Sequence, residues 1–233
     1  MTGIIGRGRR QPSDEDLAIW QRAKEDLLDR LYTGLPGRLQ MSGHRVIARW
    51  TRAYADRVVL EIGCGHGHHL HHAELKYRQY IGLDADNTFL RTLRGRFPET
   101  RVVNGDAYAL PLRDHAVDCV LSVYCFEHLR QLSSCLAEVK RVLKRDGELL
   151  IGLPAEGGTA YGIGRKLTSK RYMERKYGID YEAIVQWEHW NSYRQVEELV
   201  ARQFRIVETC FLPFRWLPSV HLNAIVCLRC RGI

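Results

Sequence analysis

A short apolar run, Val58–Leu60, leads directly into the glycine-rich sequence Glu61-Ile-Gly-Cys-Gly-His-Gly67. Glycine has no Cβ and readily adopts positive φ, so this turn lets a bound molecule approach the backbone closely. A second apolar run ends in Asp84, 21 residues after Gly63, where a nucleotide-binding βαβ unit presents a carboxylate to a ribose. The combination predicts an α/β chain with a site for an adenosine-containing cofactor.

The spacing of the glycines separates two kinds of nucleotide site. A dinucleotide fingerprint reads G-x-G-x-x-G, and its third glycine brings a helix close to the strand. Here the pattern is G-x-G-x-G, preceded by Glu61, and His68 and His69 stand where that third glycine would fall. The pattern resembles motif I of the class I S-adenosylmethionine-dependent methyltransferases.

Further motifs of that family follow in order at residues 102–107, 110–121, 126–129 and 141–147. Phe126-Glu-His-Leu129 resembles the small-molecule branch often called methyltransferase type 11. The resemblance covers about residues 56–154. It implies a Rossmann-like class I methyltransferase fold, with a seven-stranded, mostly parallel sheet of order 3-2-1-4-5-7-6 flanked by helices.

The same resemblance implies S-adenosyl-L-methionine as the cofactor. Glu61 would hold its amino group, Asp84 would accept hydrogen bonds from both ribose hydroxyls, and Asp106 would contact the adenine. The glycines would open space for the methionine and ribose portions. The expected cofactor-binding set is Glu61, Gly63, Cys64, Gly65, Gly67, Asp84, Ala85, Asp106, Ala107 and Tyr124.

Methyl transfer from a sulfonium is an in-line displacement, for which an enzyme mainly aligns the reactants in a pocket cleared of water. An alcohol or phenol acceptor must also lose a proton, so O-methylation, which we favour, benefits from a general base. We expect His128 and His189 to be the catalytic residues, and His221 is a third candidate. The alternative for His128 is a purely structural place at the start of a helix.

Five histidines lie between His66 and His72, and a helix over this segment would place His68 and His72 on one face. A metal site usually also includes a carboxylate or cysteine ligand, and Glu74 is the only acid nearby. Methyl displacement needs no metal. We therefore expect no metal site here.

The order of sequence patterns predicts one methyltransferase domain, residues 13–233, behind a flexible basic tail, residues 1–12. N-terminal helices occupy residues 13–55, the first ending at Gly34–Gly37 and the second following Ser42. Residues 155–190 are longer than an ordinary connection and rich in glycine, basic and aromatic residues, so we expect a lid-like insertion.

The net charge of +8 favours an anionic partner but does not identify it. We expect a small-molecule or lipid-linked acceptor, possibly anionic, bound under the basic insertion. The apolar segment 211–218 could also make peripheral contact with a membrane. The alternatives are an RNA methyltransferase, for which no appended nucleic-acid-binding fold is visible, and a non-catalytic scaffold that binds the cofactor.

Seven cysteines are scattered through predicted core strands, which fits a reducing cytoplasm better than a disulfide framework. Cys227 and Cys230 have C-x-x-C spacing in a predicted strand, where residues three apart point to opposite faces.

Overall fold

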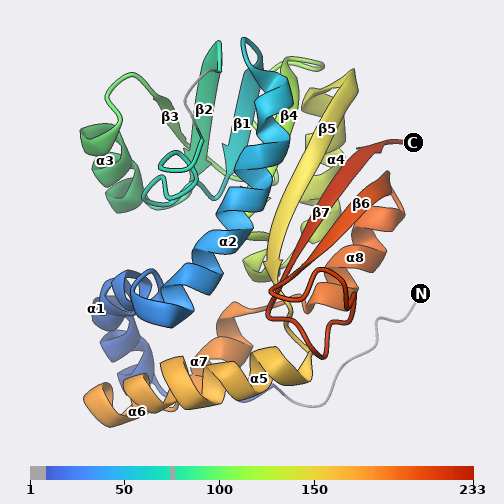
Figure 1. Ribbon diagram of the computed structural model, residues 1–233. Helices are drawn as coiled ribbons and strands as arrows, with labels where there is room; N and C mark the ends of the chain where they lie inside the picture. Colours follow the sequence, from blue (N-terminus) through green and yellow to red (C-terminus); the bar gives the residue numbers. More distant parts are fainter. Residues whose placement is uncertain (1–8, 74–76) are drawn as a thin grey trace.

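The computed structural model describes residues 9–73 and 77–233, and it is built around one seven-stranded sheet of order β3-β2-β1-β4-β5-β7-β6 (Figure 1). Strand β7 is antiparallel to both neighbours, whereas β1 to β5 pair in parallel. This confirms the predicted fold class and strand order. The strands are β1 Val58–Ile62, β2 Gln79–Asp84, β3 Arg101–Asn104, β4 Val117–Val123, β5 Leu143–Pro154, β6 Phe204–Leu212 and β7 Ile225–Gly232.

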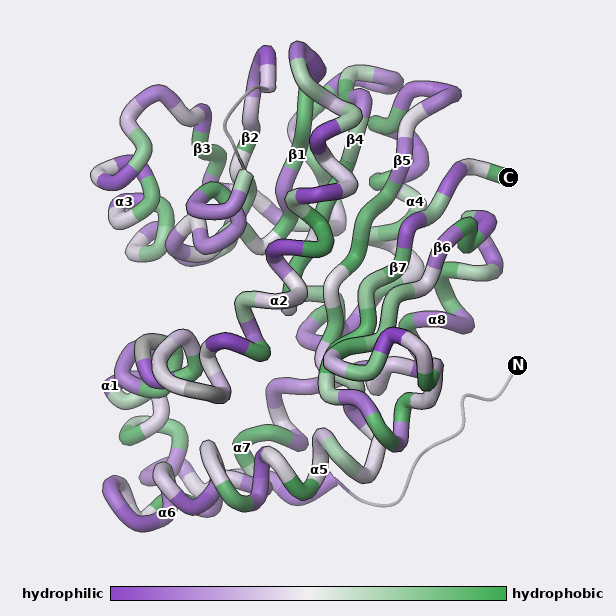
Figure 2. The backbone as a smooth tube through the Cα atoms, in the orientation of Figure 1, coloured by the Kyte–Doolittle hydropathy of each residue, from purple (hydrophilic) through white to green (hydrophobic). Residues whose placement is uncertain are grey.

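Both faces of the central strands are buried, because helices cover the sheet on each side (Figure 2). Successive side chains alternate between two apolar clusters, so Leu60 packs on one face and Val59 on the other. Helices α4 (Leu132–Val142) and α8 (Tyr193–Ala201) cover the first face, and α2 covers the second. Cys227 and Cys230 lie in opposite clusters, as the strand periodicity predicts.

The N-terminal helices are α1 (Asp14–Leu31) and α2 (Gly34–Thr51), followed by the short turn η1 (Arg52–Tyr54). A capping box opens α1, with the N–H of Ser13 donating to the Asp16 carboxylate and the N–H of Asp16 donating to the Ser13 hydroxyl. The first helix ends at Leu31, shortly before the stop expected at Gly34–Gly37, but the second begins at Gly34 and not after Ser42 as predicted. Pro36 is tolerated there because the first turn of a helix has no intrahelical acceptor for its backbone N–H groups.

The segment after the glycine turn also differs from expectation. We predicted that it begins a helix, but residues 63–73 form a series of turns. The N–H of Gly67 donates to Cys64 O at 2.9 Å, that of Leu70 to Gly67 O at 3.0 Å and that of His72 to His69 O at 2.9 Å. Positive φ at Gly65 and Gly67 interrupts the helical conformation. The next helix, α3 (Asn87–Arg96), follows β2.

Residues 155–190 are almost entirely helical. They form α5 (Thr159–Arg165), η3 (Lys166–Lys170), α6 (Arg171–Tyr177) and α7 (Tyr181–Glu188). Trp20 and Leu27 of α1 pack with Met173 and Ile184 of this segment in a separate apolar cluster. Helices α1 and α5–α7 thus form one layer across the carboxyl ends of the parallel strands (Figure 1), which we call the cap.

The predicted basic tail falls mostly on residues 1–8, which lie outside the described residues. Its next two residues, Arg9 and Arg10, contact the cap. The guanidinium of Arg9 donates to the carbonyls of Gln186 and Trp190 at 3.1 and 3.0 Å and stacks on the Trp190 ring. Arg10 pairs with Asp180 at 3.2 Å. In the described part of the chain, no helix has the length and apolar composition to cross a membrane.

Candidate active site

A cavity of about 1660 Å³ lies between the carboxyl ends of the strands and the cap. Ligand sites usually measure about 300–1,000 Å³, so this cavity has room for a cofactor and a second molecule. Of the residues expected from sequence, Gly67 and the third histidine candidate, His221, do not line it, and the others do: Glu61, Gly63, Cys64, Gly65, Asp84, Ala85, Asp106, Ala107, Tyr124, His128 and His189.

The three motif glycines all have positive φ but do different things. A Cβ on Gly63 would lie 2.4 Å from Cys125 Sγ, and one on Gly67 would lie 3.2 Å from Leu93 Cγ. Close packing therefore favours glycine, which has no Cβ, at both positions. A Cβ on Gly65 would meet no described atom within 4 Å. Gly65 is thus the glycine that leaves open space beside the cavity, as a cradle for a bound molecule requires.

Two carboxylates stand at the ends of β2 and β3. Asp84 accepts the N–H of Gly65 and the N–H of Asp86, each at 2.9 Å, and so fixes the turn beside its own strand. Asp106 accepts the N–H of Tyr108 at 2.9 Å. Each carboxylate oxygen has a second lone pair for a ligand hydroxyl or amino group. Asn104, which sequence reasoning missed, joins the two ends by donating to the carbonyls of Asp84 and Ala85 at 3.1 and 2.9 Å.

Glu61 is the buried acid of the cofactor motif and accepts a short hydrogen bond from the hydroxyl of Tyr80. Burial raises the pKa of Glu61 to about 8, and the charge of Asp84 adds to the rise, although the Tyr80 hydrogen bond opposes it. A cation placed beside this carboxyl would favour its ionised form. The site therefore fits the amino group or sulfonium that the sequence resemblance implies.

Tyr124 follows β4 with a φ of 58°, which is uncommon outside glycine. Its N–H donates to Gly152 O at 2.8 Å and its hydroxyl donates to Gln40 O at 2.7 Å. A Cβ on Gly43 would lie 2.3 Å from this hydroxyl, so α2 has glycine where the tyrosine passes. These contacts hold the Tyr124 ring between β4 and α2 at the cavity wall.

The two candidate catalytic histidines, which follow β4 and α7, both line the cavity, with ring centroids 4.6 Å apart at nearly a right angle. His128 presents its ring to the cavity, and the surrounding protein and the neighbouring His189 lower its pKa. Nδ1 of His189 lies 2.5 Å from Oε2 of Glu156. Burial lowers the pKa of His189, but the hydrogen bond and charge of Glu156, with the charges of Glu127 and Glu188, outweigh it and raise that pKa.

Glu127, Glu156 and Glu188 were missed as site residues. Glu127 lies inside the motif that led to His128, so its place in that motif was the available signal. Glu188 accepts the indole N–H of Trp20 at 2.6 Å, and Glu156 comes directly after β5. Glu188 and Trp20 are 168 residues apart in sequence, and Glu156 and His189 are 33 residues apart. No local sequence pattern links such pairs.

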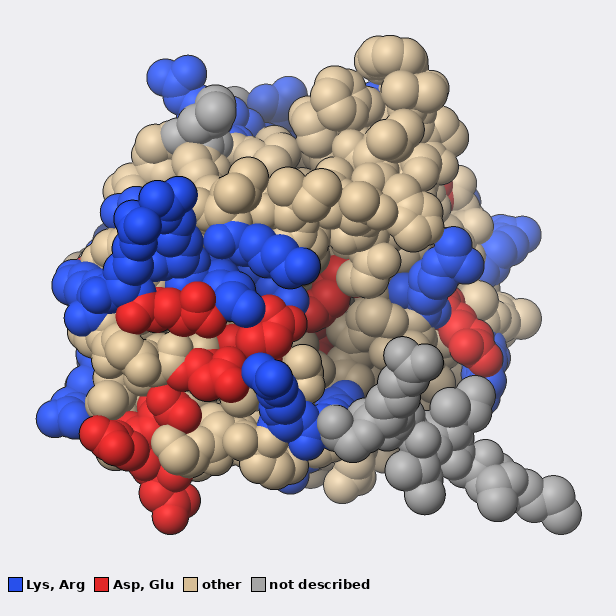
Figure 3. Space-filling model, turned by 90° about the horizontal axis from the view of Figure 1, so that it is seen from below, with Lys and Arg blue, Asp and Glu red and all other residues tan. Residues whose placement is uncertain are grey.

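Two basic residues of the insertion, Arg165 and Lys170, are engaged with acids of the same segment. Arg165 pairs with Glu156 at 3.3 Å and with Glu182 at 2.8 Å, and Lys170 approaches Glu182 at 3.7 Å. Figure 3 shows this side of the molecule, where basic and acidic side chains lie next to one another. The charge of the insertion therefore gives little support to the expected anionic acceptor, because these two cations already have partners.

The histidine cluster packs beside the glycine turn. His68 stacks on Tyr32 with ring centroids 3.7 Å apart, and the Tyr32 hydroxyl lies 3.0 Å from Nε2 of His44. His69 is fully buried, and its Nε2 lies 3.2 Å from the Tyr77 hydroxyl. Among residues 9–73 and 77–233, no three histidine, cysteine or acidic side chains are placed to hold a metal ion.

Solved structures share this architecture over nearly the whole chain. A methyltransferase of Thermotoga maritima, described as a possible histamine N-methyltransferase, has a TM-score of 0.65 at 19% identity and covers 93% of this chain and 99% of its own. The N-methyltransferase NodS of Bradyrhizobium japonicum, solved with S-adenosyl-L-homocysteine, has a TM-score of 0.64 at 14% identity, over 94% and 99%. At such identities the likeness shows the fold.

Relatives in sequence share the motif region. A probable S-adenosylmethionine-dependent methyltransferase of Mycolicibacterium smegmatis is 32% identical over 52% of this chain and 53% of its own length. A phthiotriol/phenolphthiotriol dimycocerosates methyltransferase of Mycobacterium tuberculosis is 38% identical over 38% of this chain and 34% of its own. The chain thus matches about half or less of the length of these relatives.

A family model described as a methyltransferase domain matches residues 60–151, from β1 to β5. This segment contains the glycine turn, Asp84, Asp106 and Tyr124. Residues 60–151 therefore match the methyltransferase domain family, within a chain that has the fold of the class I S-adenosylmethionine-dependent methyltransferases.

Proposed function

We propose that this protein is an S-adenosylmethionine-dependent methyltransferase that transfers a methyl group to a small-molecule or lipid-linked acceptor inside the cavity. One observation carries the proposal. The glycine turn with Asp84 and Asp106, at the carboxyl ends of β1, β2 and β3, and His189, which pairs with Glu156 beyond β5, stand around one cavity large enough for two ligands. In the sheet order, β2 and β3 lie on one side of β1 and β4 and β5 on the other, so we call the β1–β3 side of the cavity the cofactor end and the β4–β5 side the acceptor end.

Each residue of the cofactor end has a proposed task. Glu61 binds the amino group, Asp84 the ribose hydroxyls, and Asp106 the adenine edge with the amide of Ala107. Gly65 leaves room for the ligand, whereas Gly63 and Gly67 hold the turn in shape. When bound, S-adenosylmethionine supplies a methyl group activated by a sulfonium.

The acceptor end favours an oxygen nucleophile. Because the Glu156 carboxylate accepts a hydrogen bond from Nδ1–H of His189, Nε2 of the neutral ring is left to take a proton from an acceptor hydroxyl. The same contact raises the pKa of His189 and makes it a stronger base. His128, whose pKa is lowered, stays neutral and packs against the base as a positioning residue. The cap excludes water and aligns acceptor oxygen, methyl carbon and sulfur.

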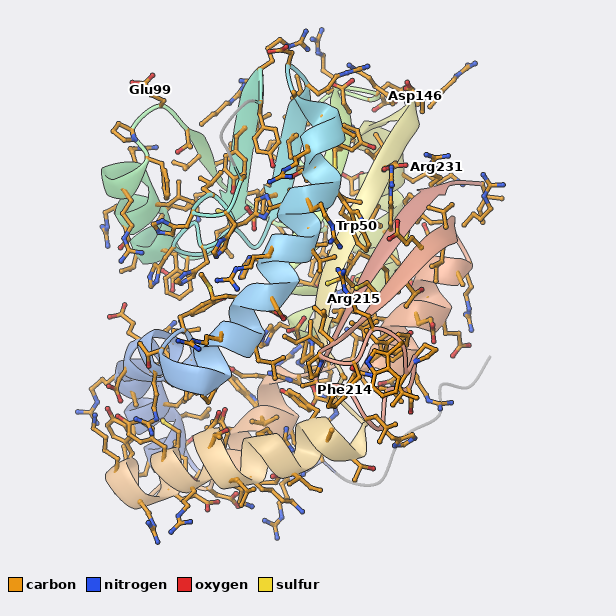
Figure 4. All side chains as sticks on the ribbon, in the orientation of Figure 1. Trp50, Glu99, Asp146, Phe214, Arg215 and Arg231 are labelled. Carbon is orange, nitrogen blue, oxygen red and sulfur yellow. The ribbon has the colours of Figure 1, made fainter. Side chains whose placement is uncertain are left out.

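The mouth of the cavity is consistent with a lipid-linked acceptor. Phe214 and Leu222 line the cavity, and Trp216 beside them is 75% exposed. Figure 4 shows Phe214 and Arg215 on the β6–β7 connection, close to α5. The N–H of Ala160 at the start of α5 donates to His221 O at 3.0 Å. Exposed aromatic rings beside a basic residue suit peripheral contact with an anionic membrane.

The first test is binding of S-adenosylhomocysteine by calorimetry, which should also raise the thermal midpoint by mass action. Lack of binding at millimolar ligand would refute the proposal. Mass spectrometry of extract supplied with the enzyme and labelled cofactor would then identify the acceptor and the methylated atom. For the membrane contact, Trp216→Ser should reduce sedimentation with vesicles containing anionic lipid, whereas Trp50→Phe, on the far side of α2, should not.

A further inference from the structure

The acceptor end holds a buried carboxylate that the proposed mechanism does not use. Glu127 is 3% exposed and lines the cavity, and its Oε2 has no hydrogen-bond partner among the described residues. A buried acceptor without a partner is costly, roughly 1–3 kcal/mol and more for a charged group. A ligand that brings a donor to this carboxylate would remove that cost.

Hydrogen bonds fix the backbone around Glu127, and this fixes the position of its side chain at the cavity. The carbonyl of Glu127 accepts the N–H of Trp190 at 2.7 Å and that of Asn191 at 3.0 Å. The Asn191 side chain donates to the carbonyls of Phe126 and Leu129 at 3.0 and 2.7 Å. Residues 190–191 therefore clamp the short helix η2 (Phe126–His128) on both sides of Glu127.

The charged residues around Glu127 favour a cationic ligand. Glu188 also lines the cavity, and Glu156 stands behind His189. Of the lysines and arginines that line the cavity, Arg165 is bonded to Glu156 and Glu182, and Lys24 lies 3.3 Å from Asp86. The remaining one, Arg38, is an exposed residue of α2. No described cation neutralises Glu127 by direct contact.

Aromatic rings complete the surroundings of Glu127. The rings of Tyr32, Tyr124 and Tyr161 line the same cavity. Burial is the main cause that raises the pKa of all three tyrosines, and the charge of Glu127 contributes to each rise. Ring faces attract an ammonium group by about 0.5–2 kcal/mol, most strongly where water is excluded.

We propose that the acceptor carries a basic amine, which binds as an ammonium group between the Glu127 carboxylate and the tyrosine rings of the cavity. The inference rests on the proposed methyltransferase function and adds the recognition group of its acceptor. The hydroxyl to be methylated then lies at His189, and the ammonium lies at the neighbouring Glu127. An anionic acceptor would meet Glu127 and Glu188 and is excluded by their charge.

Three phenols with a two-carbon para substituent that is cationic, uncharged or anionic at its end test this directly: tyramine, 4-ethylphenol and 3-(4-hydroxyphenyl)propionate. Calorimetry is carried out on the full chain with and without saturating S-adenosylhomocysteine. We expect tyramine to bind about 10- to 100-fold more tightly than 4-ethylphenol, the range for a hydrogen bond to a charged partner, and the propionate to bind most weakly. Equal affinity for tyramine and 4-ethylphenol would overturn the inference.

The variant Glu127→Gln keeps the shape of the side chain and removes its charge. Its affinity for tyramine should fall to that for 4-ethylphenol, while its affinity for S-adenosylhomocysteine stays within about twofold of the wild type. The matched control is Glu174→Gln on α6, outside the cavity, which should keep the preference for tyramine. A Glu127→Gln protein that retains the preference would refute the role of this residue.

These results separate the two proposals. If S-adenosylhomocysteine binds and the amine preference is absent, the inference fails and the methyltransferase proposal stands. If S-adenosylhomocysteine does not bind, the methyltransferase proposal fails, whatever the ranking of the probes. Should Glu127→Gln not fold, the ranking of the three probes with the wild type still decides the matter.

Discussion

The two ends of the cavity are built in different ways. At the cofactor end, the polar groups are held by nearby backbone, as when Asp84 accepts the N–H groups of Gly65 and Asp86. At the acceptor end, side chains from distant segments meet: Trp20 bonds Glu188, and His189 bonds Glu156. Changes at the cofactor end should therefore act locally, whereas changes at the acceptor end should depend on how the cap is docked.

The largest effect is expected at the acceptor end. His189→Gln should lower kcat about 10²- to 10⁴-fold, the contribution of a positioned general base, and leave the affinity for S-adenosylhomocysteine unchanged. Release of S-adenosylhomocysteine during turnover of the acceptor identified by methyl labelling measures kcat, and calorimetry measures the affinity. His221→Gln is the control, because His221 lies on the β6–β7 connection beside Thr159. An unaltered kcat in His189→Gln would remove this histidine from the mechanism.

At the cofactor end, Asp84→Ala should weaken S-adenosylhomocysteine binding by about 1.5–3 kcal/mol, the scale of hydrogen bonds to a charged group. The loss of its bonds to Gly65 and Asp86 would add to the effect. Calorimetry gives the value. Glu99→Ala, an exposed carboxylate beyond α3 (Figure 4), should bind as the wild type does. Equal affinities in the two variants would contradict the role given to Asp84.

Within the glycine turn, we expect Gly63 to matter most for the stability of the fold and Gly65 to matter most for cofactor binding. Gly63→Ala combines positive φ with a contact of 2.4 Å to Cys125, so it should cost about 2–4 kcal/mol of unfolding free energy. Gly65→Ala has free space for its Cβ and should cost only about 1 kcal/mol. Because that methyl enters the cavity, it should still weaken cofactor binding. Urea unfolding without ligand and calorimetry with it distinguish the two, and equal destabilisation would refute the distinction.

The proposed role of His189 as a general base also predicts how kcat depends on pH. His189 accepts a proton only when neutral, so kcat should rise with pH through the pKa of His189. Glu156 helps to raise that pKa, and Glu156→Gln should therefore move the acid limb of the profile to lower pH while lowering the plateau. Glu197→Gln on α8 serves as the control. A limb that stays in place would show that another group sets it.

The smallest effect is expected on the outer surface of the insertion. Lys166 and Arg171 are exposed and do not line the cavity, so Lys166→Gln with Arg171→Gln should change the acceptor KM by less than about twofold. Steady-state kinetics at two salt concentrations test this. A large rise in KM would restore the anionic-acceptor hypothesis and contradict the amine site.

The contrast between the ends also explains how far the sequence could be interpreted. The sheet order and the cofactor residues that line the cavity were predicted from the family resemblance, whose motifs cover about residues 56–154. The predicted beginning of α2 was wrong because Gly34 and Pro36 are acceptable in a first helical turn. The N–H that proline lacks would have no partner within the helix there. The helix expected after the glycine turn was wrong because Gly65 and Gly67 adopt positive φ.

The sequence by itself determined the sheet and the cofactor end, because apolar periodicity and glycine spacing act through neighbouring residues and a fixed strand geometry. Only the tertiary structure decided the acceptor end. Glu127 and Glu188 come together there through the docking of α1 and α7 on the strand ends, across separations that no local pattern records. The folded protein also pairs Arg165 with Glu156 and Glu182, so the basic residue of this cluster that lines the cavity is neutralised there.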